Sequence, residues 1–388
     1  MKIVNKEVDS IIQHKSKRVL LTATVQSHIV QFHRPLVDML HAKGCEVHVA
    51  AKDNLAEKNG LLLDFADRVY NVPFSRSPMS LDNIRAYREL KEIICSNEYD
   101  VIHCNTPVGG VLTRMIAHKE RERGTKVIYT AHGFHFYTGA PLKNWLLYYP
   151  VEWLCAHWTD VLITINKEDY ERAKKHMHAK RVEYVPGVGI DTKRFMNATV
   201  DRAAKRREIG VPEDATLLMS VGELNENKNH SVVIQALAKL NDKSVHYAIA
   251  GNGPLKASLE VLAESLGVGE QLHLLGYRRD VPELLKASDV FAFPSQREGL
   301  PVSVMEAMAA GLPIIASDNR GTRDILMDNV NALICRCDDV DGFVAAINRL
   351  STEMALKEKM VKVNQSACTN YDVTIINAQM KEIYRLEH

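Results

Sequence analysis

The sequence predicts an α/β protein made of two doubly wound parallel sheets, each with helices on both faces. Two observations predict this fold: short apolar runs alternate with helical patterns along the chain, and the alternation breaks once, at 186–189 (Pro-Gly-Val-Gly). The 388 residues, 46% of them hydrophobic, suffice for two domains with separate cores. We therefore predict a first domain of residues 1–186 and a second of residues 187–371, with a final helix in 372–388 that packs back on the first domain.

In the first half, short runs rich in Val, Ile and Leu predict strands, and stretches with apolar residues every three or four positions predict helices. The strands are 18–24, 46–51, 68–72, 100–104, 126–130, 161–165 and 181–185, and the helices lie at 36–43, 82–95, 113–118 and 145–158. The segment 25–36 contains no glycine, which excludes the glycine-rich dinucleotide loop of a dehydrogenase at that place. Residues 1–17 are expected to form a polar extension with a short helix around 8–12.

The second half repeats the architecture. Its strands are 216–222, 245–250, 272–275, 290–293, 314–316 and 332–334, and its helices lie at 231–240, 254–266, 281–287, 301–310 and 375–386. Pro301 suits the first position of its helix, and Gly311 ends that helix. Ligands bind doubly wound sheets at the carboxyl ends of the strands, so we expect the two domains to face each other across a ligand-binding cleft.

Composition narrows the class of protein. The net charge of +1 gives no field that would recruit nucleic acid, although residues 1–186 are the more basic part, with 26 Lys and Arg against 21 Asp and Glu. Seven irregularly spaced cysteines indicate reduced thiols rather than a disulfide framework or a zinc site. There is no signal-peptide pattern and no apolar run of about 20 residues. We expect a cytoplasmic protein, soluble or peripheral to a membrane.

Two glutamates with seven residues between them mark the loop and helix after strand 290–293. Glu298 lies in the loop and Glu306 in the second turn of the helix; on a single helix they would be about 12 Å apart, which does not suit the carboxylate pair of a retaining glycosidase, about 5 Å apart. Carboxylates spaced along the positive end of a helix suit a ligand with hydroxyls at both ends and a phosphate between them, such as a nucleotide-sugar. Taken alone, the pattern is more typical of ordinary acids on a solvated helix, so the context decides.

Two strand ends of the first domain carry histidines. His28 follows the first strand, and the run 131–137 (Ala-His-Gly-Phe-His-Phe-Tyr) follows the fifth. The helix at 145–158 holds all three tryptophans of the chain. Its aromatic residues either pack against the sheet or face a lipid or a lipid-linked acceptor.

Four segments of the second half, in this order, resemble the donor-binding loops of the retaining glycosyltransferases of family 4. They are 221–230 (VGELNENKNH), 250–255 (AGNGPL), 275–281 (LGYRRDV) and 294–306, which holds the paired glutamates. The resemblance covers nearly the whole chain, and the first half is most similar to enzymes of capsule, exopolysaccharide and O-antigen assembly. It implies the GT-B fold, in which two Rossmann-like domains face each other across a cleft.

The resemblance also implies the site. Glu306 would hold the ribose of the donor, Glu298 the hydroxyls of its sugar and Lys228 its diphosphate, while His132 would bond the sugar near the reaction centre. The implied catalytic residues are His132, Lys228 and Glu298. The implied donor-binding residues are Gly222, Glu223, Asn227, Lys228, Gly251, Asn252, Gly253, Tyr277, Arg278, Pro294, Ser295, Glu298, Gly299, Leu300, Pro301, Val302 and Glu306. The implied acceptor-side residues are His28, Phe134 and His135.

By the same resemblance, the donor is a UDP-sugar and the acceptor a glycan linked to undecaprenyl diphosphate at the inner face of the cytoplasmic membrane, with no metal or other cofactor. One position departs from the family: many members carry arginine where this chain has Glu223. Arg297, Arg320 and Arg323 are candidates to supply the missing charge. The alternatives are a UDP-hexosamine epimerase of the same fold and a nucleotide-sugar-binding protein without catalysis.

Overall fold

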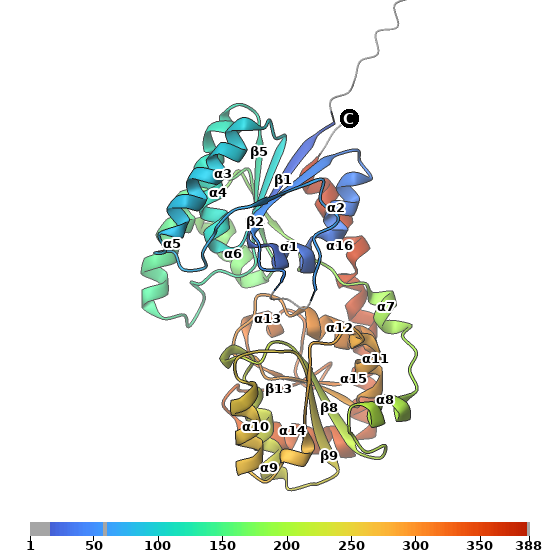
Figure 1. Ribbon diagram of the computed structural model, residues 1–388. Helices are drawn as coiled ribbons and strands as arrows, with labels where there is room; N and C mark the ends of the chain where they lie inside the picture. Colours follow the sequence, from blue (N-terminus) through green and yellow to red (C-terminus); the bar gives the residue numbers. More distant parts are fainter. Residues whose placement is uncertain (1–15, 57–59, 386–388) are drawn as a thin grey trace, which may run out of the picture.

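The computed structural model describes residues 16–56 and 60–385 and contains two parallel β-sheets, one above the other in Figure 1. The first sheet has seven strands in the order β3-β2-β1-β4-β5-β6-β7. They are β1 (Arg18–Val25), β2 (Glu46–Lys52), β3 (Arg68–Asn71), β4 (Val101–Asn105), β5 (Lys126–Ala131), β6 (Val161–Thr164) and β7 (Arg181–Tyr184). Every neighbouring pair is parallel, as the alternation of strands and helices predicts.

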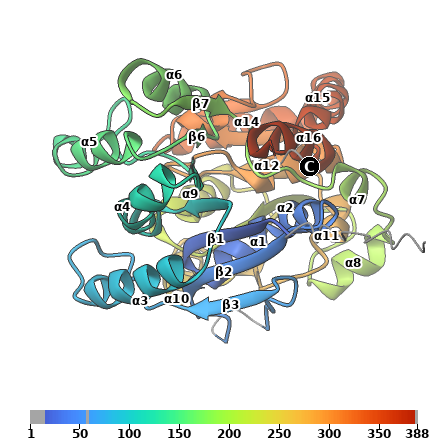
Figure 2. The same ribbon diagram turned by 90° about the horizontal axis from the view of Figure 1, so that it is seen from above.

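Helices cover both faces of this sheet because its strands are apolar on both sides. Val19 and Leu21 of β1 face a core shared with three helices, α1 (Gln26–Phe32), α2 (Arg34–His41) and α16 (Val373–Tyr384). Leu20 faces the opposite core, which is covered by α3 (Asp82–Ser96), α4 (Pro107–Glu122), α5 (Leu142–Ala156) and α6 (Lys167–His176). Seen from above, α5 lies at the rim of this domain, on the side away from α16 (Figure 2).

The second sheet has six parallel strands in the order β10-β9-β8-β11-β12-β13. They are β8 (Thr216–Val221), β9 (Val245–Ala250), β10 (Leu272–Gly276), β11 (Val290–Phe293), β12 (Ile314–Ser317) and β13 (Leu333–Cys335). One face packs on α7 (Thr192–Met196), α11 (Val281–Ala287) and α12 (Val302–Ala310), with α8 (Arg202–Glu208) against α11. The other face packs on α9 (His230–Leu240), α10 (Lys256–Ser265) and α14 (Val340–Thr352), and short segments α13 (Arg320–Arg323), η1 (Glu226–Lys228) and η2 (Gly269–Gln271) occupy loops.

The strand order reverses once in each sheet. In the first sheet the reversal lies between β1 and β4, and in the second it lies between β8 and β11. At such a point the loops after two central strands turn to opposite faces of the sheet and leave a crevice at the strand ends, which is where open α/β sheets bind ligands. The topology therefore marks one candidate site on each domain.

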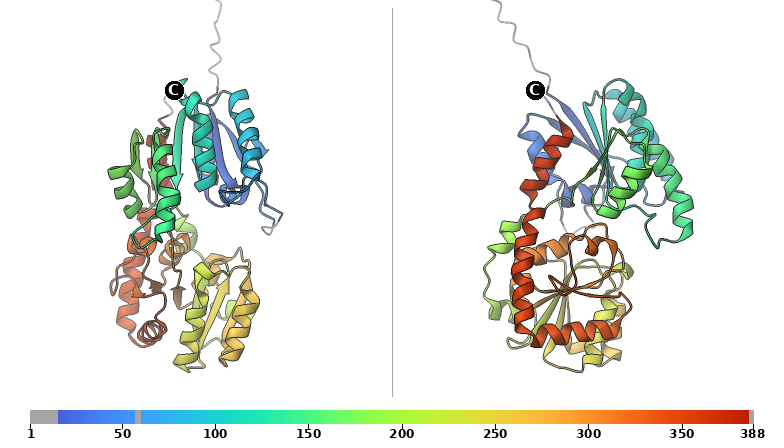
Figure 3. Two further views of the ribbon diagram at one scale, coloured as in Figure 1. Left: turned by 90° about the vertical axis from the view of Figure 1, so that its left-hand side faces the viewer. Right: turned by 180° about the vertical axis from the view of Figure 1, so that it is seen from behind.

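The last two helices join the domains. Helix α15 (Met354–Ala367) runs along the second domain, and after η3 (Cys368–Tyr371) the chain continues as α16 onto the first (Figure 3, right). Ile376 and Met380 are buried in the core of the first domain, and the Tyr384 hydroxyl lies 2.7 Å from His103 Nδ1. Helix α16 thus belongs to the core of the first domain.

The structure differs from the predicted elements in several places, of which the following lie near the predicted sites. The sequence predicts no helix at 26–32, where α1 lies, and predicts 113–118 where α4 spans Pro107–Glu122. Pro301 is the N-cap of α12 rather than its first residue. The predicted extension and short helix of residues 1–15 and the end of the last helix at 386–388 lie outside the described residues, and the domain boundary at 186/187 stays a prediction. Within the described part of the chain, no helix is long and apolar enough to cross a bilayer.

Candidate active site

The loops after β8 and β9 form one wall of the predicted donor site and touch through their backbones. A Cβ atom on Gly251 would lie 1.8 Å from the carbonyl oxygen of Gly222, and one on Gly253 would lie 2.3 Å from that of Leu224. The Leu224 amide donates to the Asn252 carbonyl at 3.0 Å. Glycine is required at 251 and 253 because no side chain fits between the two loops. The structure thus brings these predicted donor residues together.

The loops after β8 and β11 are bonded to each other at the point where the strand order reverses. Lys228 Nζ lies 2.7 Å from Glu298 Oε1, and the two side chains are only 21% and 17% exposed. Asn227 Nδ2 donates to the Arg297 carbonyl at 2.9 Å, and the Gln296 amide donates to the Asn227 carbonyl at 2.8 Å. The predicted diphosphate cation and the predicted sugar carboxylate therefore neutralise each other in this structure, and a diphosphate would compete with Glu298 for Lys228.

Glu306 stands on α12 without a hydrogen-bond or ion-pair partner among the described residues, although it is only partly exposed. Burial raises the pKa of its carboxyl from the ordinary 4.5 to about 7, against a smaller opposing effect of the Arg194 charge. A carboxylate held in a poorly solvated place without a donor is ready to accept hydroxyl hydrogens from a ligand. The geometry suits the ribose contact that the resemblance implies.

The segment 294–302 connects β11 to α12 and reaches the first domain. A Cβ atom on Gly299 would lie 2.2 Å from the carbonyl oxygen of His132, so only glycine lets the two domains approach so closely here. Leu300 is buried in the second core, and Pro301 precedes the first helical residue, Val302. Ser295 is also buried, and its hydroxyl has no partner among the described residues.

Tyr277 and Arg278 follow β10, whose last residue, Gly276, pairs with Gly251 in the loop after β9. Tyr277 is 42% exposed, and Arg278 Nε donates to Asp280 Oδ1 at 2.7 Å while its guanidinium also pairs with Glu208. Because these acids occupy the guanidinium, the Arg278 side chain is not free to contact a donor in this structure.

The three arginines predicted to supply the charge that is missing at Glu223 differ in their partners. Glu223 itself is exposed and accepts from Asn225 Nδ2 at 3.2 Å. Arg323 is paired with Asp318, 2.6 Å away. Arg297 is exposed, and its guanidinium has no partner among residues 16–56 and 60–385. Of the three, Arg297 is the one whose charge remains available to a diphosphate.

Arg320, the third of these arginines, links the domains instead. Its Nη1 lies 2.8 Å from Asp169 Oδ1 and its Nη2 donates to the Phe134 carbonyl at 2.9 Å, both in the first domain. The same guanidinium donates to the Glu298 carbonyl at 3.3 Å and lies over the Tyr137 ring, 4.8 Å from the centroid. No sequence pattern signals this contact, because Arg320 and Asp169 are far apart in the chain.

A cluster of imidazoles faces the donor loops from the first domain. His28 Nε2 and His132 Nε2 are 3.3 Å apart, and Asn105 Oδ1 lies 3.1 Å from Nε2 of both His132 and His33. Burial, reinforced by the neighbouring His33, lowers the pKa of His132 to about 3, and burial lowers the pKa of His33 to about 4. These rings are therefore neutral at physiological pH and act as hydrogen-bonding groups. Asn105 was not among the predicted site residues, and its position at the end of β4 was the available signal.

The same three histidines are the one group within the described ranges whose ligand atoms could together hold a metal ion, since these atoms lie within 4.8 Å of one another. Neutral imidazole is a common zinc ligand. Here, however, Nε2 of His33 and of His132 lie at hydrogen-bond distance from Asn105. The donor-side loops contain no such group among their described residues.

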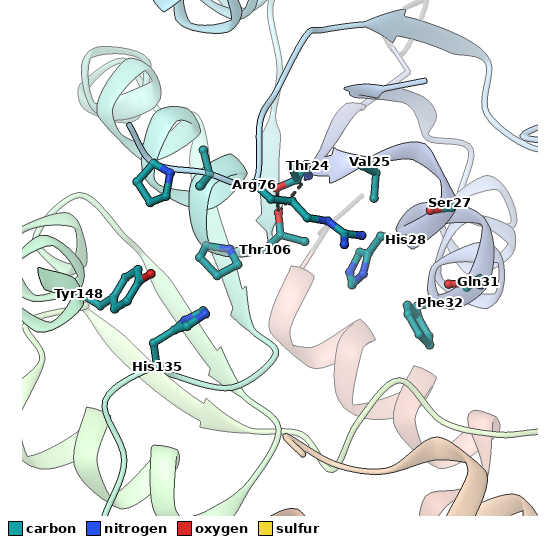
Figure 4. Close-up of a pocket in the computed structure, with 13 residues that line it drawn as sticks. Thr24, Val25, Ser27, His28, Gln31, Phe32, Arg76, Thr106, His135 and Tyr148 are labelled. Atoms are coloured by element: carbon teal, nitrogen blue, oxygen red, sulfur yellow. Dashed lines mark hydrogen bonds between the residues drawn. The ribbon is translucent and has the colours of Figure 1, made fainter. Parts of the chain in front are cut away.

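A pocket of about 380 Å³ opens where the strand order of the first sheet reverses (Figure 4). Residues after β1 and β4 line it, together with Arg76 from the loop after β3 and Tyr148 from α5. His28 and His135, two of the predicted acceptor-side residues, also line the pocket. His135 stacks on Tyr148 with 4.5 Å between ring centroids.

Phe134 does not line this pocket, which corrects its predicted place on the acceptor side. It is 3% exposed, and its ring stacks on Phe136 in the core beneath α5. Its backbone is also committed, because the Phe134 amide donates to Asp169 Oδ2 at 2.8 Å. The sequence gives no indication that the Phe134 ring, which lies between two histidines in the chain, points into the core.

Comparisons with known proteins identify the family to which the chain belongs. Residues 201–366 match the family described as glycosyl transferases group 1, and residues 18–166 match glycosyl transferase 4-like. The chain is 40% identical to the glycosyltransferase EpsD of Bacillus subtilis, over 95% of this chain and 96% of that protein. It is 26% identical to the UDP-Gal:alpha-D-GlcNAc-diphosphoundecaprenol alpha-1,3-galactosyltransferase of Escherichia coli, over 85% and 87%.

Among solved structures, Anabaena HepE in complex with UDP superposes with a TM-score of 0.77 at 19% identity, over 95% of this chain and 99% of that one. Likeness at that identity concerns the fold. With the two parallel sheets described above, it confirms the predicted GT-B architecture.

Proposed function

Because the chain belongs to the family-4 glycosyltransferases with the GT-B fold, we propose that it moves a hexose or an N-acetylhexosamine, with retention, from a UDP-sugar to a glycan on undecaprenyl diphosphate. The product would serve bacterial surface polysaccharide synthesis. The relative from Escherichia coli, named for a UDP-galactose donor and a diphosphoundecaprenol acceptor, supports this choice of substrates.

The observation that carries the proposal is the Lys228–Glu298 pair where the strand order of the second sheet reverses, together with the unpartnered Glu306 on the helix that follows the loop of Glu298. A UDP-sugar offers ribose hydroxyls, a diphosphate and sugar hydroxyls in that order. Glu306 would accept hydrogen bonds from the ribose hydroxyls, and Lys228 and Arg297 would bind the diphosphate. Glu298 would then be free to accept hydrogen bonds from the sugar hydroxyls. The amides of Gly299, Leu300 and Val302 near the start of α12 add donors for the phosphates.

The charge that develops as the nucleoside diphosphate leaves needs stabilisation, and fixed cations and amides supply it without reorganising. We propose a front-face displacement: the acceptor hydroxyl attacks the anomeric carbon from the side on which UDP departs, and the departing phosphate takes the proton. Neutral His132 would hydrogen-bond the donor sugar and would not act as a general acid, since a histidine with a pKa of about 3 carries no imidazolium proton at neutral pH. No metal enters this scheme.

Helix α5 supports peripheral attachment to the inner face of the cytoplasmic membrane. Leu142 and Leu146 are each 72% exposed, and Leu147, Val151, Trp153 and Leu154 are exposed beside them. The one acid of this helix, Glu152, is buried and paired with Arg114 at 2.7 Å, so the outer face is apolar apart from Lys143. Such a face suits the headgroup boundary of a bilayer. Leu142→Gln with Leu146→Gln should reduce flotation with phospholipid vesicles, and unchanged flotation would refute the attachment.

Incubation with a panel of UDP-sugars tests the function. Thermal shift identifies the donor, because a ligand at 100 times its dissociation constant stabilises by about 2.7 kcal/mol. Without acceptor, slow hydrolysis to UDP and free sugar supports a transferase, whereas an isomerised sugar indicates the epimerase and binding alone a non-catalytic protein. Transfer to a lipid-linked acceptor with an α-configured product from an α-configured donor supports retention, and an inverted product refutes it.

A further inference from the structure

The pocket on the first domain contains one charged side chain and no acid. Among the described residues that line it, Arg76 is the only Lys, Arg, Asp or Glu. Arg76 has no hydrogen-bond or ion-pair partner within residues 16–56 and 60–385, whereas most arginines of this chain are paired. An unpaired guanidinium in a concave site of about 380 Å³, within the ~300–1,000 Å³ usual for small-molecule pockets, indicates an anionic ligand.

The neighbours of Arg76 suit a phosphate group. The Thr24 and Thr106 hydroxyls, 2.7 Å apart, lie on the pocket wall, and Thr106 caps the start of α4 in a backbone conformation with φ of 63°. The positive end of this 16-residue helix adds to the charge of Arg76. Guanidinium and hydroxyl groups together bind phosphate in many sites.

The pocket also reaches the predicted reaction centre. Figure 4 shows Arg76 directed toward His28, and the Arg76 charge contributes to lowering the pKa of His28. His28 Nε2 in turn lies 3.3 Å from His132 Nε2, which faces the donor loop. A single sugar ring beside His28, with its phosphate on Arg76, would bring a reacting hydroxyl near His132.

We propose that Arg76 binds the diphosphate of the lipid-linked acceptor, and that the sugar attached directly to this diphosphate is the one that receives the transferred sugar. The proposal rests on the proposed function and adds to it the length of the acceptor: one sugar, and no longer glycan, between the diphosphate and the accepting hydroxyl.

Apolar side chains mark where the lipid would leave the pocket. Pro78 lines the pocket, and the next residues include Met79 and Leu81, which are 88% and 80% exposed. On the other side Tyr148 belongs to α5, whose outer face carries the exposed leucines Leu142 and Leu146. An isoprenoid chain with its diphosphate on Arg76 would pass between these two apolar segments into the bilayer.

Farnesyl diphosphate in non-ionic detergent is a probe that needs no knowledge of the acceptor sugar. Calorimetry should show that Arg76→Gln weakens its binding about ten- to a hundredfold, the usual effect of losing a charge-assisted contact, while Arg76→Lys retains part of it. Arg88→Gln, which removes an exposed and unpartnered arginine on α3, is the matched control and should bind like the wild type. Equal affinity of wild type and Arg76→Gln would overturn the proposal.

Two further arms separate the alternatives. We expect Arg76→Gln to float with phosphatidylglycerol vesicles as the wild type does. If Arg76 instead binds bulk phospholipid headgroups, Arg76→Gln will lose this flotation and keep its affinity for farnesyl diphosphate, and that result overturns the proposal. With synthetic acceptors, the KM for a monosaccharide diphospholipid should rise in Arg76→Gln, and a trisaccharide diphospholipid should be a poor substrate of the wild type. Preference for the trisaccharide overturns the proposal. Absence of UDP-sugar hydrolysis by the wild type without acceptor would count against the proposed function rather than against Arg76.

Discussion

Replacing Glu306 with glutamine should stabilise the unliganded protein and weaken UDP binding at the same time. The carboxyl of Glu306 lies in a poorly solvated part of the cleft without a donor, and its pKa is raised from 4.5 to about 7. The folded chain therefore resists ionisation of this group more than the unfolded chain does. Glutamine keeps the shape and removes the charge.

The size of the stability effect follows from the pKa. One pKa unit corresponds to about 1.4 kcal/mol, so holding Glu306 ionised costs the folded state up to about 3 kcal/mol, and about 1–3 kcal/mol once its partial exposure is considered. The cost is absent near pH 4.5, grows as pH rises because the unfolded chain ionises first, and is complete above about pH 7. At roughly 2–4 °C per kcal/mol for a domain of this size, Glu306→Gln should melt several degrees higher than the wild type at pH 8, with a much smaller difference at pH 5.

UDP affinity should change in the opposite direction. Ribose hydroxyls donate more strongly to a carboxylate than to an amide, and a hydrogen bond to a charged group is worth about 1.5–3 kcal/mol. Glu306→Gln should therefore bind UDP roughly ten- to a hundredfold more weakly at pH 8. Hydrogen bonds from the ligand would offset the free energy by which ionised, unpartnered Glu306 destabilises the empty protein. Binding sites often reduce the stability of the unliganded protein in this way.

Differential scanning calorimetry from pH 5 to 8 and isothermal titration with UDP measure both effects. Glu358→Gln, which changes an exposed acid on α15, is the control and should alter neither the melting temperature nor UDP affinity. The reasoning fails if Glu306→Gln melts no higher than the wild type at pH 8, or if it binds UDP with unchanged affinity.

Three further predictions concern the same cleft. Lys228→Ala should lower turnover about 10²–10³-fold and weaken UDP-sugar binding much less, because the negative charge of the departing diphosphate grows in the transition state. Near-normal turnover of Lys228→Ala, or an equal loss in the exposed control Lys359→Ala, would contradict the role of Lys228. Glu298→Ala should leave UDP affinity nearly intact in a calorimetric titration and lower turnover with UDP-sugar, and loss of UDP binding would mean that the donor lies in the opposite direction. Activity should survive EDTA in a transfer assay. Complete loss that Mg²⁺ or Mn²⁺ restores would contradict a metal-independent reaction, and loss that only Zn²⁺ restores would make the cluster of His28, His33 and His132 a metal site.

Most of the fold could be predicted from the sequence because both sheets are buried on both faces, and such strands read as short apolar runs between helical patterns. The errors lie where tertiary contacts override local preference. Helix α4 was predicted too short because Gly109 and Gly110 lower helical propensity, yet these glycines let its first turn pack against β1 and Tyr129. Helix α1 is short, and no side chain caps its first turn, so its sequence carries no start signal.

The donor loops could be predicted because their residues are close together in the sequence and follow strand ends. The acceptor side could not, because it depends on side chains from separate elements. Arg76 belongs to the loop after β3 and Tyr148 to α5, and nothing in their local sequence indicates a shared pocket. Phe134 shows the same difficulty, since its direction depends on the core beneath α5 rather than on the histidines that flank it.

The contact between the domains would let the two proposed sites act together. Gly299 meets the backbone of His132, and Arg320 reaches from the second domain to Asp169 and to the carbonyl of Phe134. Both attachments hold the loop that carries Glu298 against the strand end that carries His132. A donor sugar bound by Glu298 would therefore lie at the entrance of the pocket that contains His28. Removing either side chain of this buried Arg320–Asp169 pair would leave the other charge uncompensated and loosen the loop that carries Glu298. The substitution would slow transfer because the substrates are misplaced, and not because a residue that contacts them is lost.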